Sequence, residues 1–100
     1  MRYIINFGAG LEQSVIITEK FNDHYQVVVQ LIDAVIVWMD AKLNSSGHLT
    51  GDYVDVESHE GDMDVIDFLL GLGYSTAVCQ LRDWGEFQVE KKEREREKGV

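Results

Sequence analysis

Seven carboxylates lie within sixteen residues of this sequence, in the stretch DYVDVESHEGDMDVID that runs from Asp52 to Asp67. No Lys or Arg occurs between Lys42 and Arg82, so no base close in the sequence neutralises them. Carboxylates gathered in this way suit the coordination of a hard divalent cation or the attraction of a basic surface. The structural alternative is an idle, solvated face, in which Asp62 and Asp64 stabilise the first turn of a helix through its dipole. The seven acids are Asp52, Asp55, Glu57, Glu60, Asp62, Asp64 and Asp67.

A divalent-cation site is the first interpretation, and its ligands would be Asp55, Glu57, His59 and Asp62. Ca²⁺ takes about six to eight oxygen ligands, and a loop of this composition supplies several. The EF-hand pattern fails here, because counting from Asp55 puts Glu60 where that pattern requires a glycine. A divalent-metal-binding or catalytic domain built on these residues is therefore the alternative prediction, and the main prediction includes no metal and no cofactor.

The interpretation that we favour is an acidic face that docks on a basic protein surface. Residues 1–90 hold fifteen acids against four bases, and the whole chain has a net charge of −9. A body with this charge repels phosphate backbones, so we expect no direct contact with nucleic acid. Strand alternation would place Tyr53, Asp55 and Glu57 on one side, with Tyr53 as an aromatic anchor. The residues of the acidic stretch that we expect to contact the partner are Tyr53, Asp55, Glu57, Glu60, Asp62, Asp64 and Asp67.

The other candidates for chemistry have simpler structural explanations, so we predict no enzyme. The three histidines occur in no metalloprotease or deaminase pattern. Cys79 lies in an apolar run typical of a buried strand, where a thiol behaves as a small hydrophobic group. The segment GAG at 8–10 predicts a hairpin turn, because Gln13 occupies the place of the third glycine of a dinucleotide-binding loop.

These residues must be positioned by elements that the hydrophobic periodicity predicts. Short alternating apolar runs indicate strands, and the Gly-, Asn- and Ser-rich segments between them indicate turns. We expect strands at 2–7, 14–21, 50–58, 74–81 and 86–90, and helices at 23–43 and from 62 to the glycines at 71 and 73. On the second helix, Glu60, Asp64 and Asp67 would share an edge, since they are spaced by four and three residues.

The predicted helix at 23–43 is the most apolar segment of the chain. Fourteen of its twenty-one residues are apolar, whereas a helix that lies on a sheet needs only one apolar stripe. Its many β-branched residues leave a strand as an open alternative. We favour a helix because the segment is longer than a typical strand, and because Gln26, Gln30 and Asp33 recur at helical spacing. The surplus of apolar surface predicts a contact with a second copy or another partner, and this contact includes Val37 and Trp38.

The composition predicts one globular domain. One hundred residues with a hydrophobic content of 45% suffice for a core without disulfides. We expect a single α+β domain over 1–90 and a charged tail over 91–100, where KKEREREKGV mixes both signs of charge. The single cysteine indicates a reducing, cytoplasmic compartment, and the lack of an apolar run of about 18 residues predicts no contact with a membrane.

The sequence therefore predicts an α+β fold with two helices packed on one face of a mostly antiparallel sheet, in the order β-β-α-β-α-β-β. The predicted role is that of a small, non-catalytic, acidic protein that covers a nucleic-acid-binding surface of another protein. Inhibitors, immunity proteins and phage anti-defence proteins act in this way, as mimics of the charge of nucleic acid. The alternatives are the metal-binding or catalytic domain described above and an oligomeric structural subunit.

Overall fold

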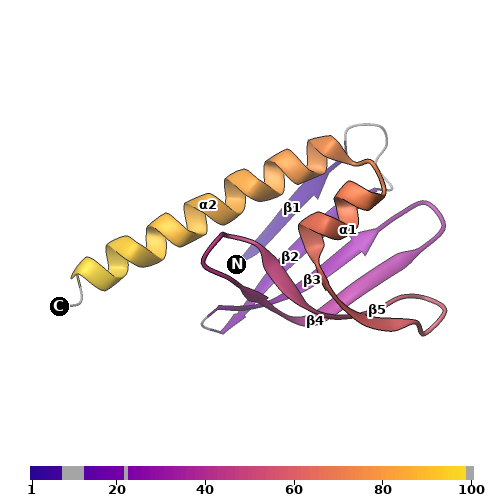
Figure 1. Cartoon of the computed structure of the whole chain (residues 1–100), viewed down its shortest axis with the longest axis horizontal. Coiled ribbons are helices and arrows are strands. Elements are labelled where there is room, and N and C mark those ends of the chain that lie inside the picture. Colours follow the sequence, from indigo (N-terminus) through magenta and orange to yellow (C-terminus); the bar gives the residue numbers. More distant parts are fainter. Residues whose placement is uncertain (8–12, 22, 99–100) are drawn as a thin grey trace.

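The computed structural model describes residues 1–7, 13–21 and 23–98 and shows an α+β fold (Figure 1). Each strand pairs antiparallel with the next one along the chain, so the six-stranded sheet has the order β1-β2-β3-β4-β5-β6. The α+β class and the antiparallel sheet are thus confirmed, whereas the predicted order of elements is wrong in detail. The elements are β1 Arg2–Asn6, β2 Ser14–Phe21, β3 His24–Gln30, β4 Val35–Leu43, β5 Leu49–Val54, β6 Glu60–Asp64, α1 Val65–Gly71 and α2 Ser75–Lys98.

The first two predicted strands are confirmed, and both contain short apolar runs rich in β-branched residues, which favour strands. Strand β1 pairs with β2 over its whole length, from Arg2 opposite Thr18 to Asn6 opposite Ser14. The glycine turn predicted at 8–10 lies outside the described residues. The strand predicted at 50–58 is shorter in the structure, since β5 ends at Val54.

The segment 23–43 was predicted as a helix, and this prediction is wrong, because the segment forms the hairpin of β3 and β4. Its many β-branched residues favour a pleated strand. A tight turn interrupts the apolar run, and in this turn the amide of Leu31 donates to the carbonyl oxygen of Ala34 at 2.8 Å. Alternate residues of β3 are buried, which is the period of a strand and not of a helix. The homodimer predicted through this helix therefore loses its structural basis.

The segments 74–81 and 86–90 were predicted as strands, but residues 75–98 form one continuous helix, α2. Its buried residues are spaced by one, three and four positions, which places them on a single helix face. They are Ala77, Val78, Leu81 and Gly85. Residues 91–98, predicted as a tail, continue the same helix, and Cys79 lies exposed on it and not in a buried strand.

The helix α1 begins at Val65, three residues later than predicted, because residues 60–64 form β6. Glu60 and Asp64 therefore lie on a strand, and the helix edge that they were predicted to share with Asp67 does not exist.

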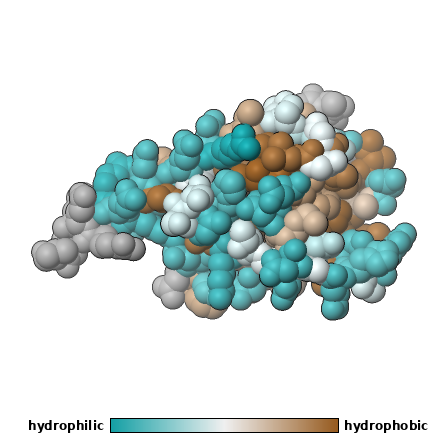
Figure 2. All heavy atoms as spheres, in the orientation of Figure 1, coloured by the Kyte–Doolittle hydropathy of each residue, from teal (hydrophilic) through white to brown (hydrophobic). Residues whose placement is uncertain are grey.

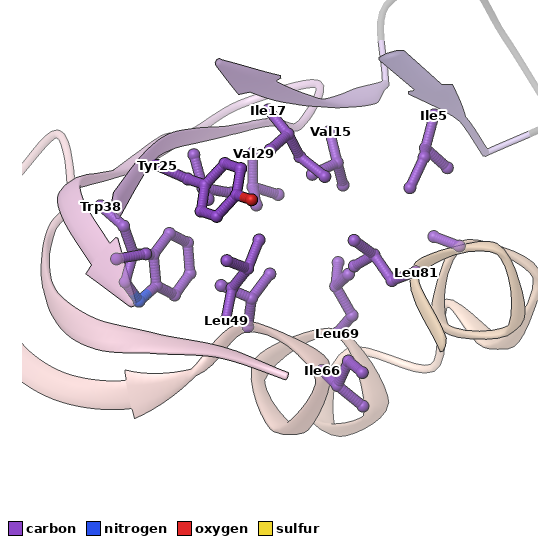
Figure 3. Close-up of a cluster of buried hydrophobic side chains, with 14 of the residues drawn as sticks. Ile5, Val15, Ile17, Tyr25, Val29, Trp38, Leu49, Ile66, Leu69 and Leu81 are labelled. Atoms are coloured by element: carbon purple, nitrogen blue, oxygen red, sulfur yellow. The ribbon is translucent and has the colours of Figure 1, made fainter. Parts of the chain in front are cut away.

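A single hydrophobic core fills the space between one face of the sheet and the two helices (Figure 3). Figure 3 shows Ile5, Val15 and Ile17 of the sheet on one side of this core and Leu69 and Leu81 of the helices on the other. The part of α2 toward its C-terminus is largely hydrophilic on the side that Figure 2 shows, whereas hydrophobic atoms gather toward the other end of this view. Among the described residues, neither helix combines the length and the apolar character that crossing a membrane requires.

Candidate binding face

The sheet has a second face, opposite the core, which we call the open face. Core residues alternate along each strand with residues that point to this face. The strand register aligns one aliphatic residue from each of the first five strands into a row across the open face. Ile4 and Val54, at the two ends of this aliphatic row, are 51% and 40% exposed, and the three between them are half-buried. The aliphatic row consists of Ile4, Ile16, Val28, Val37 and Val54.

Three carboxylates lie at the end of the open face formed by β5 and β6. Asp52 and Asp62 are directly opposite each other in the strand register, and Glu60 is opposite Val54, the last residue of the aliphatic row. All three acids are exposed. Like charges directly opposite each other on neighbouring strands are destabilising, so the pair of Asp52 and Asp62 does not stabilise the fold.

In the part of the chain that the structure describes, no ion pair includes Asp52, Glu60 or Asp62. A depression of about 520 Å³ adjoins the pair of aspartates, and its wall also contains Asp40, Lys42 and Thr50. The open face thus combines an apolar row with a mainly acidic end, which we call the acidic end and define as Asp52, Glu60 and Asp62.

Asp55 has a structural role in the turn that follows β5. Its Oδ1 accepts hydrogen bonds from the backbone amides of Glu57 and His59, both at 2.9 Å, and its Oδ2 lies 3.0 Å from Nδ1 of His59. The amide of His59 is the main reason that the pKa of the Asp55 carboxyl lies below its usual range, and the His59 ring adds to the effect. Asp55 is therefore engaged within its own turn.

Asp64 is the N-cap of α1. Its Oδ1 accepts from the backbone amides of Ile66 and Asp67 at 2.8 and 3.3 Å, which satisfies donors that the helix itself leaves free. Its Oδ2 lies 3.0 Å from Nδ1 of His48, and the Asp64 side chain is only 15% exposed. A residue engaged in this way contributes to folding and has little surface left for a partner.

We expect the change Asp64→Ala to lower the free energy of unfolding by about 1 kcal/mol, because an N-cap is lost. Asp64→Asn should retain most of that stability, since asparagine caps as well as aspartate does. The matched control is Asp62→Ala, two residues earlier on the same strand, for which we expect a change within about 0.5 kcal/mol. Urea denaturation monitored by circular dichroism measures all three, and equal losses at 62 and 64 would refute the capping role.

Of the two aromatic residues predicted to contact a partner, Trp38 belongs to the core and Tyr53 packs against it. Trp38 is 0% exposed, and its indole Nε1 donates to the carbonyl oxygen of Met63 at 3.0 Å. Tyr53 is half-buried against Trp38 and Phe68, with ring centroids 5.6 and 6.4 Å away. Both point to the side of the sheet that the helices cover.

Of the nine residues predicted to bind a partner, the open face brings together Val37, Glu60 and Asp62. Glu57 is exposed in the turn after β5, and Asp67 is exposed on α1, so neither belongs to the open face. Five residues of the open face were not predicted from the sequence to belong to a binding face. They are Asp52 and four members of the aliphatic row, Ile4, Ile16, Val28 and Val54. Val28 was missed because 23–43 had been assigned to a helix, whereas the other four lie in segments predicted as strands, and only the strand pairing aligns them.

The residues of the cation interpretation do not converge on one point. Asp55 and His59 bind each other in the turn, whereas Asp62 points to the open face from β6. Within residues 1–7, 13–21 and 23–98, no three His, Cys, Asp or Glu side chains are arranged to hold a metal ion.

Comparisons with protein-family models, with curated proteins and with solved structures gave no match. The geometry of the open face is therefore the basis of the functional argument.

Proposed function

We propose that this protein is a non-catalytic binding protein whose open face docks on a basic surface of another protein and covers it. One observation carries the proposal, which is the aliphatic row that ends in three acids that form no ion pair in the described part of the chain. Specific interfaces have an apolar centre and a polar rim. The open face has both parts, since the aliphatic row supplies the centre and the acidic end supplies one side of the rim.

The acidic end defines the chemistry of the partner. Asp52 and Asp62 repel each other in the free protein, and a guanidinium or ammonium group placed between them would remove that repulsion. Arginine suits this position best, because its planar fork can bind carboxylates in a bidentate manner. The adjoining depression, whose wall also contains Asp40, Lys42 and Thr50, provides room for such a side chain.

A surface that normally binds nucleic acid fits this description. Such surfaces carry several Lys and Arg side chains that contact phosphates. The net charge of −9 attracts these surfaces over a distance and repels nucleic acid itself. The protein would therefore compete with nucleic acid for its partner, which is the action of an inhibitor of the kind that immunity and phage anti-defence proteins represent.

The proposal predicts fast, salt-sensitive association with the protein that this chain captures from its host cell. Steered association exceeds the rate of about 10⁵–10⁶ M⁻¹s⁻¹ that is typical of uncharged surfaces. The combined change Asp52→Asn, Glu60→Gln and Asp62→Asn should slow association about tenfold at low salt and flatten its salt dependence. Stopped-flow mixing at several salt concentrations measures this rate.

The matched control removes three charges from the opposite side of the molecule. This control combines Glu86→Gln, Glu90→Gln and Glu93→Gln, and it changes the net charge by the same amount. The three glutamates are exposed along α2. This control should retain most of the wild-type association rate. Equal slowing by both variants would show that only net charge matters, and unchanged rates for the variant of the acidic end would refute the proposed face.

A further inference from the structure

A second concave site lies on the helical side of the molecule, between β1–β3 and the middle of α2. It is a pocket of about 220 Å³, and four of its nine lining residues are aromatic. The rings of Tyr3 and Trp84 stack with centroids 6.2 Å apart, and Tyr25 meets Trp84 edge-on at 5.4 Å. Tyr25 is only 3% exposed, whereas Phe87 is 55% exposed and has no covering layer. The pocket therefore offers an apolar interior with one open aromatic wall.

Two side chains of opposite charge share the lining of this pocket. Glu19 lies on β2 opposite Tyr25 in the strand register, and Lys91 lies on α2 two turns after Trp84. Both are exposed, and in the described part of the chain no ion pair joins one to the other. Both also line an adjoining polar depression at the mouth of the pocket, together with Asp23, Lys92 and Glu95. Of these three, Asp23 and Lys92 form an ion pair with each other.

The size and the charges together define the ligand class. A volume of 220 Å³ is below the range of about 300–1,000 Å³ that is typical of sites for drug-sized ligands, so the ligand is small. The aromatic walls favour an apolar group. The carboxylate of Glu19 and the ammonium group of Lys91 favour a ligand that carries one positive and one negative charge. A ligand with a single charge would leave either Glu19 or Lys91 without an opposite charge on the ligand.

We propose that this pocket binds a free α-amino acid with an aromatic or large aliphatic side chain. The side chain would lie against Tyr3, Trp84 and Phe87, the ammonium group at Glu19 and the carboxylate at Lys91. Burial is the main cause that raises the pKa of Tyr25, and the charges of Glu19 and Asp23 add to it. The Tyr25 phenol thus stays neutral and adds no further negative charge beside the ligand.

The two tryptophans allow a direct test by NMR. In spectra of the ¹⁵N-labelled protein, L-phenylalanine should shift the indole N–H signal of Trp84 in a saturable manner. The indole N–H of Trp38 is the internal control, because it is buried and bonded to Met63, and it should not move. Phenylalaninamide lacks the carboxylate and 3-phenylpropionate lacks the ammonium group, so each should bind at least about fivefold more weakly than phenylalanine.

Two variants assign the charges. Glu19→Gln should weaken the binding of phenylalanine and leave that of 3-phenylpropionate unchanged, whereas Lys91→Gln should weaken phenylalanine and leave phenylalaninamide unchanged or tighter. Glu86→Gln and Arg82→Gln, exposed on α2 outside the pocket, should change neither. The proposal is overturned if Trp84 does not shift at millimolar phenylalanine, or if either singly charged analogue binds as tightly as the zwitterion. A tighter binding of phenylalaninamide would identify an aromatic site for cations instead.

Discussion

Replacing Trp38 with alanine is expected to lower the free energy of unfolding by about 3–5 kcal/mol, which is the cost of removing a large buried aromatic side chain. Trp38 is 0% exposed and packs against Tyr53 and Phe68, with ring centroids 5.6 and 5.5 Å away. The change also removes the donor to the carbonyl oxygen of Met63. A domain of this size has a total stability of only about 5–15 kcal/mol, so a large share of it would be lost.

The neighbouring residue Val37 is the matched control, because it points to the opposite side of the same strand. Val37→Ala removes a half-buried group from the open face and should cost about 1 kcal/mol or less. Urea denaturation of both variants distinguishes the core from the open face. Similar losses for Trp38→Ala and Val37→Ala would contradict the assignment of β4 as a strand with one buried side.

The second large effect is expected at Gly85, where α2 crosses the turn between β4 and β5. A Cβ atom on Gly85 would lie 2.8 Å from the carbonyl carbon of Gly47 and closer still to its oxygen, and these are backbone atoms that cannot rotate away. Overpacking of this kind costs about 1–3 kcal/mol or more. Alanine normally stabilises a helix relative to glycine by up to about 1 kcal/mol, so Gly85→Ala should reverse the usual sign.

Gly71, the last residue of α1, provides the control for this substitution. A Cβ atom there would meet nothing within 4 Å, and its φ is not positive. Gly71→Ala should therefore leave the free energy of unfolding unchanged or raise it by about 0.5–1 kcal/mol. Thermal and urea denaturation measure both changes, and a stabilising Gly85→Ala would contradict the close contact between α2 and the turn at Gly47.

The sequence predicted the α+β class and the first strand pair because 2–6 and 14–21 contain short apolar runs rich in β-branched residues, separated by a glycine-rich segment. It failed at 23–43 because the turn at Leu31–Ala34 contains no glycine, so the two strands read as one long apolar run. It failed at 75–90 because the apolar residues of α2 form a short, discontinuous stripe beside several polar ones. Gly85 was predicted to form a turn. In the structure it is a helical residue, and a glycine is needed there because α2 approaches the backbone of Gly47 closely.

The acidic stretch was recognised from the sequence, but its division into roles depends on strand pairing. Asp55 and Asp64 bind backbone amides, which the order of residues alone does not reveal. The aliphatic row is assembled from five strands and exists only through their register, so no single segment of the sequence contains it.

We propose that the open face, and not the core or the helices, contacts the partner. Methyl NMR of the labelled protein, with and without the protein that it captures, tests this claim most directly, because neighbouring residues of one strand act as controls for each other. The methyl signals of Ile16 and Val28 on the open face should shift or broaden, while those of Ile17 and Val27 in the core should not. Unchanged signals at Ile16 and Val28, together with shifts confined to the helices, would contradict the account.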